Sequence, residues 1–277
     1  MSGCRNRSRT RRRVCLPWNP EMARAFTRLW LDGSDLRTIT GSSSVSAWSD
    51  KSGNSRHATT SVRHPSLLTG ATNGLSAIKF TQASATKLDT TDFSLAPDRK
   101  FCSFVVASGS GLISSNTFPR LWIAKGTGDS QSAGSTYHQG FFGAGGSNNT
   151  AMQIAGGNGT VSPIVTGLPT TPLLLTGRFG TAGLGANVNS ICQNGGTQST
   201  LSGQTGALST TGIRVGSDVG TATTSAWNSW VGEIILTGDI SFELSRIFEG
   251  YLAWKWGTNS LLAANHPFKL RPPVAGD

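Results

Sequence analysis

The sequence predicts an all-β fold, a two-sheet antiparallel sandwich with one C-terminal helix and an extended N-terminal arm. Gly, Ser and Thr account for 102 of the 277 residues. All three disfavour helix, Gly through backbone entropy and the hydroxyl side chains by competing for backbone hydrogen bonds. Short apolar segments alternate with turn residues, a pattern typical of a sandwich rather than of alternating βαβ units. The chain is also long enough to bury a substantial core.

Residues 1–17 are the predicted arm. Residues 1–13 contain six arginines and no acid, so they contribute +6 of the formal net charge of +10. By composition this segment is expected to be disordered alone and to bind an acidic protein surface through Arg–carboxylate bonds. The expected partner-binding residues are Arg5, Arg7, Arg9, Arg11, Arg12 and Arg13. Nucleic acid is the less favoured partner, because no aromatic residue interleaves the arginines and no nucleic-acid-binding motif follows them.

The cysteines fall into two pairs. Cys4 and Cys15 lie in the arm, where neighbouring arginines should lower the thiol pKa. They are candidates for an intermolecular disulfide to a neighbouring subunit, which requires an extracellular particle. Cys102 and Cys192 lie in predicted strands and are expected to be buried free thiols that pack as small apolar residues.

No membrane association is expected. No apolar run approaches the roughly 20 residues that span a bilayer. The stretch Val14–Pro17 after the arginines is also far too short for the apolar region of a signal peptide.

Residues 18–277 are expected to form one domain. Asn194-Gly195-Gly196 is a strong hairpin signal, because Asn and Gly accept the positive φ of tight turns. The predicted strands are Phe26–Leu31, Val45–Ser49, Leu75–Phe80, Phe101–Ala107, Leu121–Lys125, Gly140–Gly143, Ala151–Ala155, Leu173–Phe179, Val188–Gln193, Gly212–Gly216 and Val231–Thr237. Trp30, Trp48, Trp122 and Trp230 lie within these strands, where burial is expected.

A helix is predicted over residues 241–256. Its apolar residues follow helical spacing, Ser241 can cap its start, and Gly257 stands where a C′ glycine belongs. A single helix after the last strand is expected to close one open end of the sandwich.

Four segments together carry a family resemblance. They are Leu29–Asp35 (LWLDGSD), Val45–Ala58 (VSAWSDKSGNSRHA), Asn73–Phe80 (NGLSAIKF), and Gly232–Leu236 (GEIIL) continuing in Glu249–Gly257 (EGYLAWKWG) and Asn265–Phe268 (NHPF). The chain resembles the concanavalin A-like (laminin G-like) jelly-roll domain of many bacteriophage structural proteins and bacterial surface proteins. Arg11–Arg13 ahead of Trp18-Asn19-Pro20 also looks like the lead segment of phage members. The resemblance implies two antiparallel sheets packed face to face, but that fold serves many functions.

Hydrolases of this fold contain a motif that resembles Glu-x-Asp-x-x-Glu, because glycoside hydrolysis uses two nearby carboxylates. The nearest candidates are Glu233 and Asp239, whose six-residue separation does not match the two- or four-residue spacing that keeps two acids close on one face of a strand. The sequence therefore favours a protein that is not an enzyme.

No cofactor is expected, and the four histidines lack the spacing of a zinc site. Asp32, Asp35 and Asp50 are candidate oxygen ligands for Ca²⁺. The favoured alternative is that residues 50–54 form a turn, in which Asp50 accepts backbone N–H bonds and Gly53 supplies positive φ.

These observations favour a non-enzymatic bacteriophage virion structural protein, such as a capsid decoration, minor capsid or collar-type component, on the outer surface of the particle. The arm would anchor it to other virion proteins, and a homo-oligomer is expected. The alternative is a host-recognition module of a tail fibre or adhesin that binds cell-surface glycan, with Tyr137, His138, Asn148 and Asn149 as conceivable contacts in loops.

Overall fold

A computed structural model gives the fold. It describes residues 16–94, 100–108, 119–125, 138–142, 151–155, 164–166, 172–181, 184, 188–202, 212–217 and 226–277.

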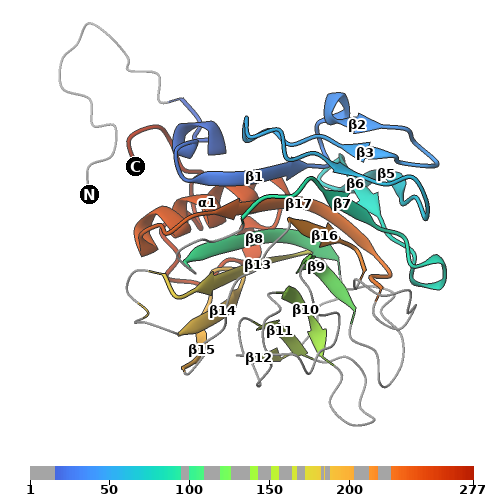
Figure 1. Ribbon diagram of the computed structural model, residues 1–277. Helices are drawn as coiled ribbons and strands as arrows, with labels where there is room; N and C mark the ends of the chain where they lie inside the picture. The colour runs from blue at the N-terminus through green and yellow to red at the C-terminus, as the bar shows by residue number, and fades with distance from the viewer. Residues whose placement is uncertain are drawn as a thin grey trace, which may run out of the picture.

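The described strands form two antiparallel sheets, which confirms the predicted two-sheet all-β sandwich (Figure 1). The first sheet has the order β15-β14-β13-β8-β17-β6-β5, with β1 also paired to β17. Its strands are β1 (Thr27–Asp32), β5 (Ser66–Thr72), β6 (Leu75–Lys79), β8 (Phe101–Ser108), β13 (Pro172–Phe179), β14 (Asn189–Gln193), β15 (Ser199–Leu201) and β17 (Trp230–Thr237).

The second sheet has the order β12-β11-β10-β9-β16-β7-β4-β3-β2. Its strands are β2 (Ile39–Thr40), β3 (Ala47–Trp48), β4 (Ala58–Thr59), β7 (Leu88–Thr90), β9 (Arg120–Ala124), β10 (His138–Phe142), β11 (Ala151–Ala155), β12 (Ile164–Thr166) and β16 (Ile213–Val215). Short 3-10 helices lie at Pro20–Ala23 (η1), Leu36–Thr38 (η2), Gln82–Ser84 (η3) and Asn259–Leu261 (η5).

All eleven predicted strands are present. The segments that sequence analysis did not predict are β2, β4, β5, β7, β12 and β15. Five of these are two or three residues long, and β5 contains Ser, Thr and Gly rather than an apolar run. The predicted hairpin is also confirmed, since Asn194 and Gly195 both have positive φ, at 50° and 60°.

The central strands of the first sheet are buried on both faces, which explains why the sequence of β8 is almost continuously apolar. Phe101, Val105 and Ala107 face the second sheet and join the core of the sandwich. Phe104 and Val106 point the other way, into a second apolar core beneath the helix. The protein therefore has three layers.

Helix α1 (Phe242–Lys255) forms the third layer (Figure 1). The Ser241 side chain accepts a hydrogen bond from Leu244 N, and Gly257 follows the helix with a φ of +69°. The helix covers the outer face of the first sheet, so the expectation that it closes an open end of the sandwich is wrong. The physical reason is the apolar outer face of β8, which must be covered.

The described chain begins against its own C-terminal tail. Trp18 N donates to Pro273 O (3.1 Å), and Ala275 N donates to Leu16 O (2.9 Å). The Trp18 ring packs edge-on against Phe248 of α1, with ring centroids 4.9 Å apart. Figure 1 shows this blue N-terminal segment beside the red tail.

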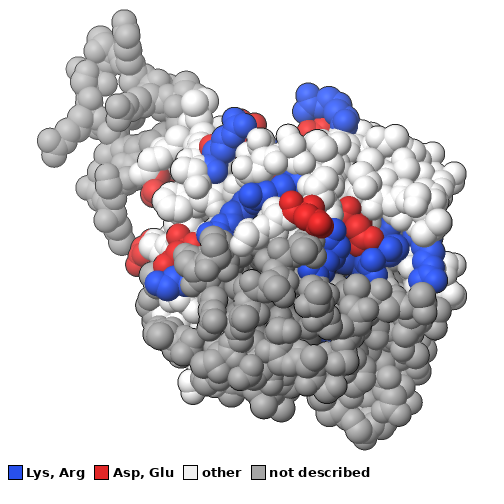
Figure 2. Space-filling view, in the orientation of Figure 1, with Lys and Arg blue, Asp and Glu red and all other residues white. Residues whose placement is uncertain are grey.

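Charged side chains are sparse, at 14% of the residues. Figure 2 shows much of the described surface without Lys, Arg, Asp or Glu, and acids and bases that lie side by side where they do occur. Within the described ranges, no helix is both long and apolar enough to cross a membrane.

Candidate functional site

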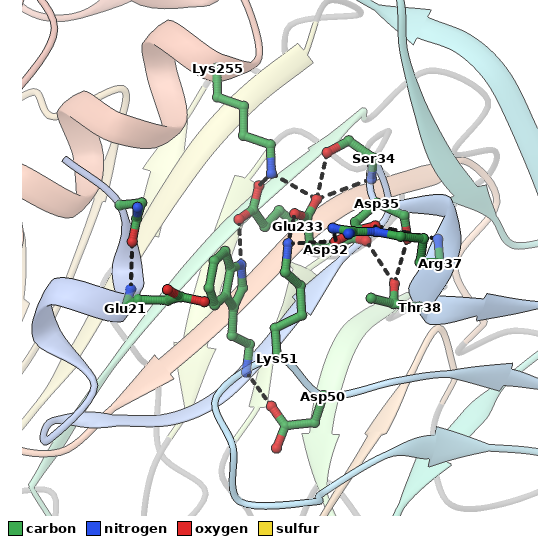
Figure 3. Close-up of polar contacts among 12 residues, drawn as sticks. Glu21, Asp32, Ser34, Asp35, Arg37, Thr38, Asp50, Lys51, Glu233 and Lys255 are labelled. Carbon is green, nitrogen blue, oxygen red and sulfur yellow. Dashed lines mark hydrogen bonds and ion pairs between the residues drawn. The ribbon is translucent and has the colours of Figure 1, made fainter. Parts of the chain in front are cut away.

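Two polar regions lie against helix α1, one at each end of it. The first is the acid–lysine cluster, made of Asp32, Asp35, Lys51, Glu233 and Lys255 (Figure 3). Asp32 on β1 and Glu233 on β17 are register partners across the two strands. Lys255, from the end of α1, bridges them with its Nζ 2.7 Å from Asp32 Oδ1 and 2.6 Å from Glu233 Oε2.

Glu233 is fully buried and receives hydrogen bonds on both carboxylate oxygens. The indole Nε1 atoms of Trp30 and Trp256 donate to it at 2.6 and 2.8 Å, and the Tyr251 hydroxyl lies 3.3 Å from Oε1. Burial raises the pKa of Glu233 above its usual value, and the nearby Asp32 charge adds to this, whereas Lys255 opposes it.

Asp32 titrates in the opposite direction. Burial pushes its pKa up, but Lys255 and Lys51 outweigh burial and hold the pKa below its usual value. The Lys51 Nζ lies 2.8 Å from Asp32 Oδ2 and 3.0 Å from Asp35 Oδ2. Hydrogen bonding to Arg37, followed by Lys51, likewise holds the pKa of Asp35 far below its usual value. Lys51, Lys255 and Arg37 thus occupy the carboxylate oxygen atoms of the two aspartates.

Asp50, the third candidate Ca²⁺ ligand, lies outside the acid–lysine cluster, and its carboxylate accepts hydrogen bonds from backbone N–H groups (Figure 3). Its carboxylate accepts from the backbone N–H groups of Trp30 (2.9 Å), Ser52 (2.8 Å) and Arg56 (3.0 Å). Gly53 has a φ of +85°. Residues 50–54 therefore have the geometry of the turn that the sequence favours over a Ca²⁺ site. Across the part of the chain that the structure describes, no group of three or more His, Cys, Asp or Glu could hold a metal ion.

The pairing of Asp32 with Glu233 was missed by sequence reasoning. A search for two acids along one strand finds Glu233 and Asp239, whereas the structure brings Glu233 next to an acid on a neighbouring strand. The register of β1 against β17 creates this pair, and no local spacing in the sequence indicates it.

The second polar region is the C-terminal groove, with a volume of about 1240 Å³. It lies between the start of α1, the β14–β15 hairpin and the C-terminal tail. Its lining residues are Gly195, Gly196, Thr197, Gln198, Phe242, Glu243, Arg246, Ile247, Ala263, Asn265, Pro267, Phe268, Arg271, Gly276 and Asp277.

The wall of the groove formed by the hairpin is fixed by close contacts. Ala263 N donates to Asn194 O (3.1 Å), and Asn194 Oδ1 accepts from Leu174 N (3.0 Å). A Cβ atom at Gly195 would lie 2.5 Å from the His266 ring, so only glycine fits this position. The hairpin and the tail are therefore locked together.

The arginines of the groove are already paired. Arg246 Nη1 donates to Gly195 O (2.6 Å) and lies 3.3 Å from Oε2 of the buried Glu249. Glu249 also accepts from Thr176 Oγ1 (2.8 Å) and lies 3.2 Å from His266 Nε2. Arg271 forms a two-pronged ion pair with Asp277, at 2.8 Å for each contact.

The neutral polar groups of the groove are open. The side chains of Thr197, Gln198 and Asn265 make no hydrogen bond to any residue in the described ranges. Phe242 beside them exposes 42% of its surface. An aromatic ring next to uncommitted hydroxyl and amide groups suits a ligand that has both C–H faces and hydroxyl groups.

Several residues singled out from the sequence lie outside what the structure describes. They are Cys4, Arg5, Arg7, Arg9, Arg11, Arg12, Arg13 and Cys15, and the side chains of Tyr137, His138, Asn148 and Asn149. Cys102 and Cys192 are buried free thiols, as predicted. Burial raises the pKa of Cys102 to about 11. The predicted burial of Trp30, Trp48, Trp122 and Trp230 is also confirmed.

Comparison with known proteins gives similarity in structure only. No protein-family model matches the chain, and no curated protein sequence is detectably similar. Domain 4 of the GH43 extracellular arabinanase AbnA from Geobacillus stearothermophilus, solved with arabinotriose, matches with a TM-score of 0.50 and 11% identity, over 77% of this chain and 94% of that one. The sialidase of Trypanosoma rangeli, solved with sialic acid, matches with a TM-score of 0.55 and 12% identity, over 88% of this chain. This match spans only 36% of the sialidase.

These matches show that the chain shares its β-sandwich fold with a domain of the arabinanase and with part of the sialidase. They contradict the expectation, drawn from the sequence, that the protein is not an enzyme, since the arabinanase and the sialidase are both enzymes. That expectation rested on the spacing of acids along one strand, which does not reveal acids that lie on neighbouring strands. At 11% and 12% identity, the likeness itself establishes the shared fold.

Proposed function

We propose that the protein is a carbohydrate-binding β-sandwich and that the C-terminal groove holds the glycan. The observation that carries this proposal is the combination of the exposed Phe242 ring with the uncommitted side chains of Thr197, Gln198 and Asn265 in one groove. Sugar rings present apolar C–H faces and a rim of hydroxyl groups, which match an aromatic face and neutral donors and acceptors.

Two further facts support the proposal. The arabinanase domain that shares this fold was solved with arabinotriose, so the fold is compatible with an oligosaccharide ligand. Pockets of roughly 300–1,000 Å³ hold drug-sized ligands, and the groove, with about 1240 Å³, has room for more than one sugar ring.

The test is glycan binding by the full chain, measured on a glycan array and then by titration calorimetry with the best ligand. We expect Phe242→Ala to weaken binding about tenfold or more, because an aromatic platform contributes on the order of 1–2 kcal/mol. Phe26→Ala is the matched control, since Phe26 is 46% exposed and does not line the groove. Equal affinities for the two variants would remove the groove from the proposal, and a chain that binds no glycan would overturn it.

A second proposal concerns the arm. We propose that residues 1–15 anchor the protein to an acidic surface of a bacteriophage particle, with Cys4 or Cys15 available for a disulfide. Support comes from the arginine content of the arm and from the firm attachment of Leu16 and Trp18 to the body, which gives the arm a fixed base. Deletion of residues 1–15 should leave a folded, glycan-binding body that no longer joins the particle. Normal incorporation would overturn this proposal.

A further inference from the structure

Both arginines that line the described part of the C-terminal groove are engaged with other groups of the protein. Arg246 is held by Gly195 O and Glu249, and Arg271 is held by both oxygens of Asp277. The bond to Arg271 holds the pKa of Asp277 below its usual value, so this carboxylate is ionised at neutral pH.

A further carboxylate, besides those of Asp277 and Glu249, lies at the groove. Glu243 lines the groove in the first turn of α1. Hydrogen bonds from its own backbone N–H and from the Ser241 hydroxyl hold its pKa below the usual value. The buried Glu249 beneath the groove is the third carboxylate, and Arg178, whose guanidinium lies 5.4 Å from the centroid of the Phe242 ring, is the third guanidinium. An anionic sugar placed here would therefore find the cations already matched by carboxylates, so the groove offers it no net attraction.

The groups that remain available are all neutral. Thr197, Gln198 and Asn265 contribute one hydroxyl and two amides, and each of these can both donate and accept hydrogen bonds. Sugar hydroxyl groups have the same dual character, whereas a sugar carboxylate only accepts.

From these contacts, and resting on the proposed function, we infer that the groove selects neutral oligosaccharides and rejects glycans that carry a carboxylate. Sialylated and uronic-acid-containing glycans are the excluded class. The Arg271–Asp277 ion pair sets this preference, because Asp277 occupies the guanidinium face that would otherwise bind a carboxylate of the ligand in two-pronged fashion.

The experiment compares neutral and acidic trisaccharides by titration calorimetry on the full chain. The neutral probes are arabinotriose and cellotriose, and the acidic probes are trigalacturonic acid and 3′-sialyllactose. We expect the better neutral probe to bind at least about tenfold more tightly than either acidic probe. We also expect its affinity to change little when the ionic strength is raised.

The Asp277→Asn variant tests the assigned cause. It removes one carboxylate and releases Arg271, so the ratio of neutral-probe affinity to acidic-probe affinity should fall about tenfold. Asp92→Asn is the matched control, because the Asp92 side chain is 72% exposed and lies outside the groove.

The outcomes separate the inference from the proposed function. Tighter binding of an acidic probe by the unmodified chain would overturn the inference and leave carbohydrate binding intact. A preference for neutral sugars that Asp277→Asn does not change would overturn the role of the ion pair. Failure to bind any glycan, on the array as well as in these titrations, would overturn the proposed function and the inference with it.

Discussion

The acid–lysine cluster and the C-terminal groove lie at opposite ends of helix α1 and use the same residue types differently. In the cluster, Glu233 is fully buried, and two indoles, a hydroxyl and an ammonium group all point at it. In the groove, Arg246 and Arg271 are paired with carboxylates, whereas Thr197, Gln198 and Asn265 make no side-chain hydrogen bond within the described ranges. The difference teaches that polar content alone does not mark a binding site. A binding site is better indicated by polar side chains without hydrogen-bond partners that lie beside exposed apolar surface.

The largest expected effect comes from breaking the cluster with Glu233→Ala. The substitution leaves two buried indole N–H groups without their acceptor and leaves Lys255 paired with Asp32 alone. Because removal of one partner from a buried ion pair is strongly destabilising, we expect a loss of roughly 3–5 kcal/mol in the free energy of unfolding. Chemical denaturation monitored by tryptophan fluorescence measures it.

The matched control for this variant is Glu21→Ala. Glu21 is exposed on η1, so its removal should leave the denaturation midpoint unchanged. A Glu233→Ala midpoint close to that of the unmodified protein would show that the cluster does not hold α1 on the sheet, and the contrast between the two regions would fail.

An effect of intermediate size on the free energy of unfolding is expected when the pH is changed. The pKa of Glu233 lies above 4.5 in the folded protein, so its contribution to stability is complete below pH 4.5 and is lost as pH rises through the raised value. The unfolding free energy of the unmodified protein minus that of Glu233→Gln should therefore fall as pH rises from 4.5 towards neutral, because glutamine does not titrate.

The pH dependence of stability expected for Asp32 has the opposite sign and serves as an internal check. Its pKa lies below 3.8, so its contribution is complete above pH 3.8 and is lost as pH falls. The corresponding difference for Asp32→Asn should shrink on acidification. Differences that stay flat with pH for both variants would mean that the two carboxyls are not tuned in opposite directions.

The smallest effect on stability is expected from Gln198→Ala in the groove. This side chain makes no hydrogen bond within the described ranges, so the free energy of unfolding should change by less than about 0.5 kcal/mol. Glycan affinity, measured by titration calorimetry, should fall several-fold, because a hydrogen bond contributes on the order of 1 kcal/mol. Gln82→Ala, outside the groove, serves as the control. If Gln198→Ala lowered the free energy of unfolding but left glycan affinity unchanged, the distinction between the groove and the acid–lysine cluster would fail.

Much of the fold could be predicted because strands buried on both faces have a local signature. The apolar runs of β8, β13 and β17 predict three central strands of the first sheet, and Ser241 and Gly257 predict the bounds of α1. Strands such as β2 and β4 could not be predicted, because each is only two residues long and depends on partners far along the chain.

The site was far less accessible from the sequence. Only the hairpin turn of the groove has a local signal, in Asn194-Gly195-Gly196. The bond from Arg246 to the hairpin and the pairing of Asp32 with Glu233 both arise from tertiary register. Sequence patterns indicate which residues can form ion pairs, but the fold decides which of them are paired and which stay open.

The contact between Leu16, Trp18 and the tail has a mechanical consequence. Residues 271–277 form one wall of the groove, and Pro17 bridges to Val274 within that same stretch. A pull on the chain ahead of Leu16 is therefore transmitted first to this wall and, through the Trp18 ring, to Phe248 of α1. Attachment of the leading segment to a surface would place the groove wall directly in the line of tension, so tethering and ligand retention would become coupled.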